Sequence, residues 1–240
     1  PKDLFKSIVT EAFDLGSREI GLFAGAEPLT CKWLDEHIKL CKEIGYEYQY
    51  ISTNGALGDE GRFRKIIDAG LSSIKFSVNG GNKDVYREVH GKDQFDKVIK
   101  NIKYVNRYRD DSKKDLFLGV SFVGMENTKH TFRELKELLD GHVDEIIYYE
   151  ASNQSGQMPN LPLPPYRDCH LPFNKVHISV EGYMKACCND YENYLAVSDV
   201  KEVSLLEAWH GKLFRDLRKN HLENSFANNL CSNCIRGFYF

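Results

Sequence analysis

Hydrophobic positions in the first 150 residues follow two spacings that alternate along the chain. Apolar residues three or four positions apart indicate amphipathic helices, and short continuous apolar runs indicate strands. The helical spacing predicts helices at residues 4–13, 31–44, 59–69, 95–105 and 132–139. The apolar runs predict strands at residues 20–24, 46–51, 73–78, 116–123 and 143–149. This alternation favours an α/β fold of parallel strands, in either an open doubly wound sheet or part of a barrel.

The alternation ends at residues 151–168, which contain four of the seven prolines of the chain. A proline-rich stretch of this kind indicates an extended linker. Beyond it, residues 176–180 and 183–188 flank a Glu-Gly pair and predict a β-hairpin with a tight turn. One closing amphipathic helix is marked by Leu206, Trp209, Leu213 and Leu217. We therefore predict an α/β domain at residues 1–150, a linker at 151–168 and a small domain at 169–240.

Charge and hydropathy narrow the class of protein. The 240 residues carry 32 basic and 35 acidic side chains, for a net charge of −3. A general binder of nucleic acid or of anionic membranes would be basic, so we expect neither as a partner. No run approaches the ~18 apolar residues of a membrane helix, and the first residues lack the apolar core of a signal peptide. These features predict a soluble, cytoplasmic protein with a full hydrophobic core.

Cysteines gather at the C-terminal end of the chain, where Cys169, Cys187, Cys188, Cys231 and Cys234 lie. The other two, Cys31 and Cys41, are predicted to be core residues of one helix. A disulfide scaffold would spread its cysteines through a shorter chain, so this clustering indicates a metal site. Four thiolates suit either a tetrahedral zinc ion or an iron–sulfur cluster, and the spacing leaves both open.

The predicted ligands of that metal site are Cys169, Cys187, Cys231 and Cys234. Cys231 and Cys234 are close enough in sequence to chelate together, and folding the hairpin onto the closing helix would bring the other two beside them. Cys188 is the surplus cysteine. Neighbouring side chains of a strand point to opposite faces, so only one of Cys187 and Cys188 should face the metal.

Several segments resemble the motifs of one enzyme family. Residues 21–30, with Gly-Ala-Glu-Pro, resemble its Gly-Gly-Glu-Pro segment, and residues 51–55 resemble its Thr-Asn-Gly turn. Residues 74–80 resemble its serine-containing fourth strand, and residues 86–102 the helical region that follows. Residues 169–234, with Cys-Cys-Asn-Asp and a final Cys-x2-Cys, resemble its auxiliary-cluster domain. In this order and spacing, the chain resembles the radical S-adenosylmethionine (SAM) enzymes that carry a C-terminal SPASM or twitch-type domain.

The resemblance implies a partial (β/α)6 barrel that lacks its first strand, followed by a small iron–sulfur domain of a β-hairpin and a helix. SAM would lie at the carboxyl ends of the strands, where parallel α/β folds place their ligands. The family's second glycine is replaced here by alanine, and an arginine common in relatives is replaced by His90. The residues that the resemblance assigns to SAM are Gly25, Ala26, Glu27, Ser52, Ser77 and Asn79.

The family's Cys-x3-Cys-x2-Cys motif does not occur in the 240 residues. The resemblance places that motif after the first barrel strand, before Pro1. We therefore expect a longer protein, in which the preceding segment holds a second 4Fe–4S cluster.

The resemblance implies an oxidoreductase that generates a 5′-deoxyadenosyl radical from SAM and abstracts hydrogen from a polar substrate, either a peptide or a sugar-like molecule. Four cysteine ligands imply an auxiliary 4Fe–4S cluster for electron transfer, and the expected electron donor is external, such as flavodoxin or ferredoxin. Tyr148, Tyr149 and residues 153–157 follow the last strand and are expected to line the open face. The alternative is a non-catalytic α/β binding protein whose tail is held by zinc or by a cluster.

Overall fold

The computed structural model describes residues 2–23, 25–158, 160–162, 169–226 and 228–235. The chain divides into two compact units, Gly16–Glu150 and a second unit that combines Pro1–Leu15 with Ala151–Phe240. The predicted linker falls in the second unit, and residues 159 and 163–168 of it lie outside the described residues. Ala24, the last residue of the first predicted strand, also lies outside them.

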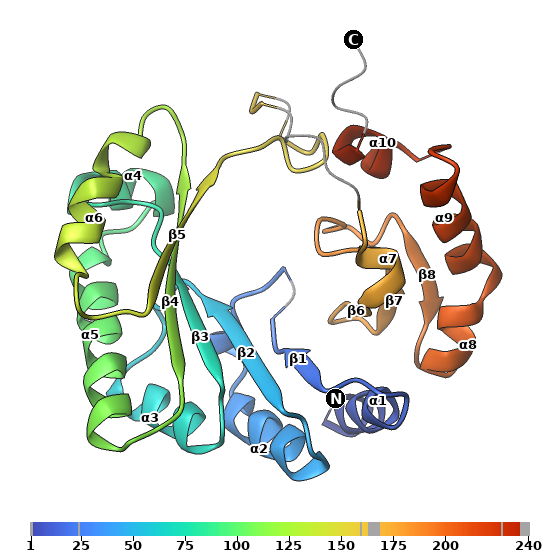
Figure 1. Cartoon of the computed structure of the whole chain (residues 1–240), viewed down its shortest axis with the longest axis horizontal. Coiled ribbons are helices and arrows are strands. Elements are labelled where there is room, and N and C mark those ends of the chain that lie inside the picture. The colour runs from blue at the N-terminus through green and yellow to red at the C-terminus, as the bar shows by residue number, and fades with distance from the viewer. Residues whose placement is uncertain (1, 24, 159, 163–168, 227, 236–240) are drawn as a thin grey trace. The chain divides into compact units, whose positions relative to one another are not determined.

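A five-stranded parallel sheet forms the centre of the first unit, in the order β1-β2-β3-β4-β5 (Figure 1). Its strands are β1 (Glu19–Gly21), β2 (Tyr48–Thr53), β3 (Ser73–Ser77), β4 (Phe117–Gly124) and β5 (Glu145–Glu150). The connecting helices are α2 (Leu34–Ile44), α3 (Glu60–Asp68), α4 (Lys83–His90), α5 (Phe95–Asp111) and α6 (Phe132–Leu138), with short 3-10 turns η1 (Pro28–Thr30) and η2 (Lys129–Thr131). The predicted alternation of helix and strand is therefore present.

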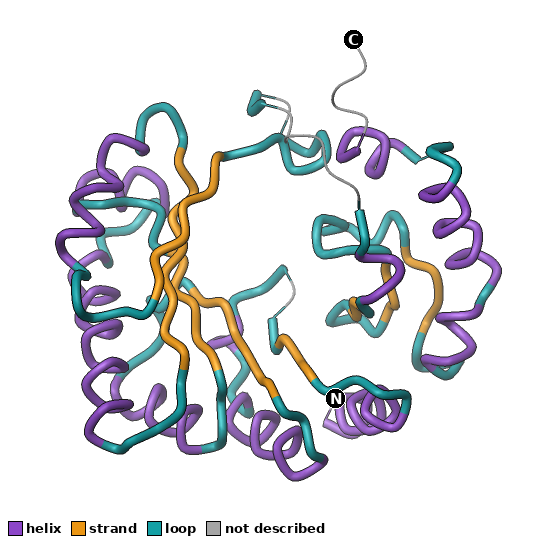
Figure 2. The backbone as a smooth tube through the Cα atoms, viewed as in Figure 1, coloured by secondary structure: helices purple, strands orange, loops and turns teal. Residues whose placement is uncertain are grey.

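The strand order decides between the two folds that the periodicity left open. Each crossover moves one strand further in the same direction, so right-handed connections place all the helices on one face of the sheet. Helices α2 to α6 lie along that one face in Figure 2. A doubly wound sheet would reverse direction and carry helices on both faces. The first unit is therefore a segment of a barrel wall.

The two faces of the sheet differ in polarity. Ile51, Ile74, Phe76, Val120 and Phe122 point to the helices and are buried in one hydrophobic core. The residues between them along the strands point to the opposite face, because side chains alternate along a strand. Within the described part of Gly16–Glu150, no helix covers that opposite face, which we call the open face. It carries Tyr50, Ser52, Lys75, Ser77, Gly119, Ser121 and Tyr149.

The polar residue Gln49 lies on the buried face of the sheet. Gln49 of β2 is fully buried, and neither atom of its side-chain amide has a hydrogen-bond partner among the described residues. Leaving buried polar atoms unpaired costs roughly 1–3 kcal/mol. We expect Gln49→Met, which keeps the side-chain length, to raise the free energy of unfolding of this unit by about 1 kcal/mol. A chemical denaturation series would detect the gain, and a loss of stability would show that the amide has a partner.

The second unit is built around a three-stranded antiparallel sheet, β6-β7-β8. The strands are β6 (His177–Ile178), β7 (Tyr183–Lys185) and β8 (Ala196–Asp199). Its helices are α1 (Lys2–Asp14), α7 (Leu171–Asn174), α8 (Leu205–His210), α9 (Lys212–Leu222) and α10 (Asn229–Ile235). The first helix of the chain packs on α8, and the Leu206 N–H donates to Glu11 Oε1 over 3.3 Å.

Two details of this unit differ from the sequence prediction. The predicted hairpin is present as β6 and β7, but a third strand, β8, pairs with β7 as well. The single closing helix is in fact two helices, α8 and α9, separated at Gly211, whose backbone is extended with φ −61° and ψ 155°. This break lets Trp209 of α8 pack edge-on against Phe214 of α9, with the ring centroids 5.0 Å apart.

No helix among the described residues has both the length and the apolar character needed to span a membrane.

Candidate functional site

Cysteine side chains line a cavity of about 330 Å³ in the second unit. Cys169 precedes α7, Cys187 and Cys188 follow β7, and Cys231 and Cys234 lie one helical turn apart on α10. Residues three positions apart lie on the same side of a helix, so α10 can present both of its sulfurs to the cavity. The structure thus brings the four predicted ligands, Cys169, Cys187, Cys231 and Cys234, around one space from three separate segments.

The loop that carries Cys187 is held by its own polar contacts. Asp190 is fully buried, and its two carboxylate oxygens accept from the N–H groups of Tyr194 at 2.8 Å and Leu195 at 2.9 Å. The ammonium group of Lys185, also buried, donates to the Asp190 carbonyl oxygen at 2.6 Å. Hydrogen bonds between its own residues therefore hold the loop between β7 and β8 in place beside the cavity.

Removing the Asp190 carboxylate should loosen this loop. Hydrogen bonds to a charged acceptor are worth about 1.5–3 kcal/mol each, so we expect Asp190→Ala to destabilise the loop by roughly 3 kcal/mol. Amide hydrogen exchange over residues 183–199 would measure the effect. Asp216→Ala on the outer side of α9, which removes an exposed pair with Lys212, is the matched control and should leave the exchange unchanged.

Burial raises the pKa of two of the cavity thiols, Cys187 and Cys231. The pKa of Cys187 is raised to about 12 by burial, and that of Cys231 to about 11 for the same reason. Nearby cysteines raise both pKa values further, because adjacent thiolates repel one another. Several thiolates can therefore coexist here only with a compensating positive group, such as bound iron or zinc.

The four cysteines line one cavity, which has room for a metal group. Within the described residues, no group of three or more histidine, cysteine, aspartate or glutamate side chains is arranged to hold a metal ion. Four cysteine ligands around such a space are the donor set of a 4Fe–4S cluster.

The structure corrects the argument about Cys188. Strand β7 ends at Lys185, so Cys187 and Cys188 lie in a loop and strand alternation does not separate their side chains. Both line the cavity, and Cys188 is the exposed one. The two N-terminal cysteines do not share a helix either: Cys41 is buried in α2, whereas Cys31 follows η1 and precedes α2.

Glu27 joins two of the motif segments in the first unit. Its Oε1 accepts from the Leu29 N–H at 3.0 Å and from the Thr53 hydroxyl at 2.5 Å. Its Oε2 accepts from the Asn54 N–H at 2.8 Å. The carboxylate therefore ties the loop after β1, where Gly25 has a positive φ of 68°, to the end of β2. Gly25 and Ala26 lie in this loop beside Glu27.

The turn after β2 is held from a second side. Gly55 has φ 71°, and a Cβ there would come within 2.6 Å of the Phe76 ring, so only glycine fits. The buried side-chain amide of Asn101 on α5 donates to the carbonyl oxygens of Gly55 at 2.9 Å and Gly58 at 3.1 Å. The Thr-Asn-Gly segment is thus fixed by contacts within the chain.

A row of serine hydroxyls crosses the open face. Ser52 on β2, Ser77 on β3 and Ser121 on β4 have neighbouring Oγ atoms, 3.4 Å and 3.3 Å apart. Hydroxyls both donate and accept, so the row can bind a ribose or a carboxylate. Ser121 was not among the predicted site residues. Only the strand register, which pairs Ser77 with Ser121, reveals it.

The loop after β3 is anchored by the two remaining motif residues. Asn79 has φ 54°, and its Oδ1 accepts from the Val123 N–H at 2.9 Å. His90 stacks on Tyr86 and makes a hydrogen bond of 2.8 Å from Nε2 to the Val78 carbonyl oxygen. Both side chains hold the loop to its neighbours.

The two tyrosines of β5 lie on opposite faces. Tyr148 packs against Phe122 and Phe132 on the helix side, and its hydroxyl donates to Glu150 at 3.1 Å. Tyr149 is on the open face and 45% exposed. Only Tyr149 is therefore placed to line the open face as expected.

Residues 153–157 belong to the second unit, where their side chains contact the cysteine-bearing loop. The Gln157 amide donates to the Asn189 carbonyl oxygen at 2.7 Å, and the Asn189 amide donates to Ser155 Oγ at 3.1 Å. The Tyr191 hydroxyl donates to Gln154 at 3.1 Å. Ser155 also lines the cysteine cavity. In this structure, these amides and hydroxyls secure the loop that holds Cys187.

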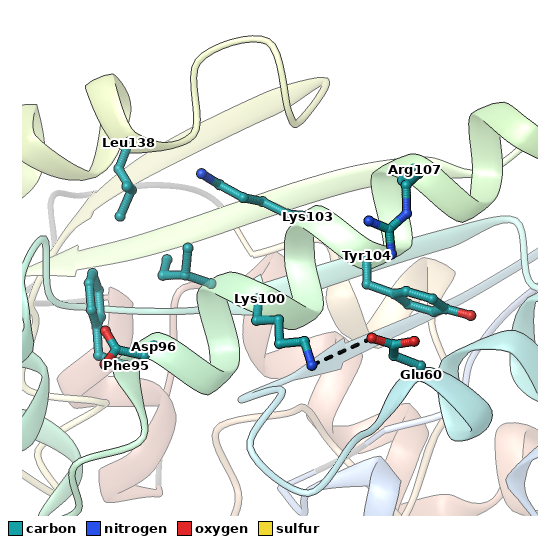
Figure 3. Close-up of a pocket in the computed structure, with 9 residues that line it drawn as sticks. Glu60, Phe95, Asp96, Lys100, Lys103, Tyr104, Arg107 and Leu138 are labelled. Atoms are coloured by element: carbon teal, nitrogen blue, oxygen red, sulfur yellow. Dashed lines mark ion pairs between the residues drawn. The ribbon is translucent and has the colours of Figure 1, made fainter.

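A separate groove of about 400 Å³ lies on the outer surface of the helix layer (Figure 3). It runs along α5, where Lys100 pairs with Glu60 at 3.5 Å and Arg107 lies over the Tyr104 ring. The groove is on the helix side of the sheet, away from the serine row, and none of the predicted site residues lines it.

Family models match both parts of the chain. The model of the Radical SAM superfamily matches residues 1–139, and that of SPASM, an iron–sulfur cluster-binding domain, matches residues 169–235.

Curated relatives are similar over part of their length. A probable GTP 3′,8-cyclase of Saccharolobus solfataricus is 26% identical, over 73% of this chain and 69% of that protein. The S-adenosyl-L-methionine-dependent 2-deoxy-scyllo-inosamine dehydrogenase of Niallia circulans is 24% identical, over 96% of this chain and 78% of that protein. The match to an uncharacterized protein of Methanocaldococcus jannaschii, 25% identical over 52% of this chain, spans only 42% of that protein.

Solved structures share the fold. SuiB of Streptococcus suis, bound to its precursor peptide SuiA, superposes with a TM-score of 0.74 at 16% identity, covering 91% of this chain and 60% of SuiB. BtrN in complex with AdoMet and 2-DOIA superposes with a TM-score of 0.62 at 19% identity, covering 97% of this chain and 79% of BtrN.

Proposed function

The chain belongs to the radical SAM superfamily and carries a SPASM iron–sulfur domain, and on this premise we propose that the protein is an enzyme that abstracts hydrogen from a polar substrate. The observation that carries this proposal is the cavity lined by Cys169, Cys187, Cys231 and Cys234. Four thiolates leave no iron of a 4Fe–4S cluster open to substrate, so the auxiliary cluster supplies an electron acceptor. The proposed reaction is therefore an oxidation.

The sheet of the first unit provides the SAM site in this proposal. SAM, when bound and reduced, supplies a 5′-deoxyadenosyl radical that removes one hydrogen atom from the substrate. Glu27 keeps the backbone of Gly25 and Ala26 fixed against the end of β2, where main-chain groups can bind the methionine amino group. Ser52 and Ser77 offer neutral hydroxyls for the ribose or the carboxylate.

The substrate class follows from the chemistry of the open face. Serine hydroxyls, Lys75 and Tyr149 can hydrogen-bond a hydroxylated or amide-bearing molecule. Two proteins similar to this chain support this class. The Niallia circulans relative is named a dehydrogenase of 2-deoxy-scyllo-inosamine, which is sugar-like, and SuiB was solved with its precursor peptide bound. We propose a two-electron dehydrogenation of such a polar substrate: one hydrogen atom is abstracted, one electron passes to the acceptor, and one proton is lost.

The test uses the full-length protein, reconstituted anaerobically with iron and sulfide and supplied with an external reductant such as flavodoxin. We expect bound iron, SAM-dependent release of 5′-deoxyadenosine, and an electron paramagnetic resonance signal from a cluster held by the C-terminal cysteines. Stoichiometric zinc without iron at those cysteines would contradict the electron-transfer role. Bound clusters without any SAM cleavage would favour a binding protein.

A further inference from the structure

A single lysine occupies the centre of the open face. Lys75 lies on β3, the middle strand of the sheet, and its register partners are Ser52 on β2 and Gly119 on β4. Ser77 and Ser121 lie two residues further along β3 and β4, toward the carboxyl ends of the strands and on the same face. We call these five residues, Ser52, Lys75, Ser77, Gly119 and Ser121, the Lys75 patch.

The small neighbours of Lys75 leave space around its side chain. Gly119 has no side chain, and a Cβ there would lie 3.3 Å from the Phe117 ring and 3.7 Å from Lys75 Cγ. Phe117 precedes Gly119 on β4, so it lies toward the amino end of the sheet, whereas Ser77 and Ser121 lie toward the carboxyl end. A ligand that enters from the carboxyl end can therefore reach the lysine and the hydroxyls together.

The side chain of Lys75 runs toward the carboxyl end of the sheet. Its Nζ lies 5.9 Å from the centre of the Tyr149 ring on β5. In the strand register, Lys75 is level with Gly119 and hence with Glu145, four residues before Tyr149. The ammonium group is thus carried past the serine row to the edge where parallel α/β folds bind their ligands.

Apart from the Tyr149 ring, the charge of Lys75 has no anionic or hydrogen-bonding partner within the described residues. None of the ion pairs or hydrogen bonds of this part of the chain involves its ammonium group, although the residue is half-buried. Glu145 on β5 is level with Lys75 in the strand register, but it lies at the amino end of β5. The Lys75 side chain extends the other way, toward Tyr149. A partly buried ammonium group normally has an anionic or hydrogen-bonded partner, because desolvating an unpaired charge is costly.

We propose that the Lys75 patch binds an anionic group of the substrate, either a carboxylate or a phosphate. This inference rests on the proposed function, since it assigns a chemical class to the substrate of the same site. The ammonium group supplies the charge, and the hydroxyl of Ser121, the serine of the row that is not assigned to SAM, supplies a neutral donor to a remaining oxygen. Lys75 then positions the substrate and selects for its charge.

The experiment compares matched ligands on the full-length, cluster-containing protein with SAM bound, by isothermal titration calorimetry. One pair is glucose 6-phosphate and glucose, and the other is N-acetylglutamate amide and N-acetylglutamine amide. The variants are Lys75→Met, which keeps the apolar stem, and Lys75→Arg, which keeps the charge. Lys39→Met, a change at an exposed lysine of α2, is the control.

We expect the wild type and Lys39→Met to bind one anionic ligand at least about tenfold more tightly than its neutral twin. The pair that shows this preference distinguishes phosphate from carboxylate. Lys75→Met should lose the preference and Lys75→Arg should keep it, with SAM affinity unchanged in both.

Two results would overturn the proposal. One is a wild type that discriminates neither pair. The other is a Lys75→Met protein that weakens SAM instead of the ligands, which would assign Lys75 to the SAM carboxylate. A wild type that neither binds nor cleaves SAM would contradict the proposed function itself, and the SAM titration reports this separately.

Discussion

Replacing Cys231 with alanine is expected to remove the auxiliary cluster, with a loss of about four irons per chain. Cys231 is buried and lines the cavity together with Cys169, Cys187 and Cys234. The three remaining thiolates would leave one iron of the cluster without a protein ligand, which weakens its binding. Iron and sulfide analysis of the reconstituted protein, with its visible absorption spectrum, measures the result.

Two other cysteine variants serve as controls. Cys31→Ala lies in the first unit, far in sequence from the cavity, and should retain all the iron. Cys188→Ala removes the fifth cysteine of the cavity and should also retain it, because four ligands suffice. If Cys188→Ala lost the iron and Cys231→Ala kept it, Cys188 would replace Cys231 in the set of cluster ligands.

Replacing Glu27 with glutamine is expected to weaken SAM binding by at least about tenfold. The carboxylate accepts three hydrogen bonds, from Leu29, Thr53 and Asn54, and a glutamine has only one side-chain acceptor oxygen. One donor would then face an NH₂ group, and the loop after β1 would separate from the end of β2. Hydrogen bonds to a charged group contribute about 1.5–3 kcal/mol each, which is more than a tenfold change in affinity requires.

Equilibrium dialysis with SAM measures the affinity of this variant. Glu60→Gln is the matched control, because Glu60 lies on the outer helices and forms an exposed pair with Lys100. Unchanged SAM affinity in Glu27→Gln would show that the link between the two loops is dispensable for binding. A parallel thermal unfolding experiment separates a local effect from general loss of structure.

The sequence predicted much of the sheet unit because its pattern is local. Strand β4 and helix α5 are clear from their apolar runs and helical spacing, and the alternation of helix and strand predicted parallel strands joined by helices. The choice between a barrel and a doubly wound sheet was not local. It depended on which strands pair, and the order β1 to β5 appears only in the folded sheet.

The errors in the second unit have a common cause. Gly211 lies inside an otherwise continuous helical pattern, and only the packing of Trp209 on Phe214 shows that the chain turns there. Strand β8 is short and has no strong pattern, so its pairing with β7 decides its conformation. Cys188 was assigned by strand alternation, which does not apply because β7 ends at Lys185.

By itself, the sequence determined which residues could carry the chemistry: the C-terminal cysteines, the Glu-Pro segment, and Ser52 and Ser77. Tertiary structure alone decided how they are arranged. It brought three separate segments around one cysteine cavity, turned Glu27 into a link between two loops, and added Ser121 and Lys75 to the open face. The physical reason is that residue type and spacing are local properties, whereas a binding site is made by strand register and by contacts between segments far apart in the chain.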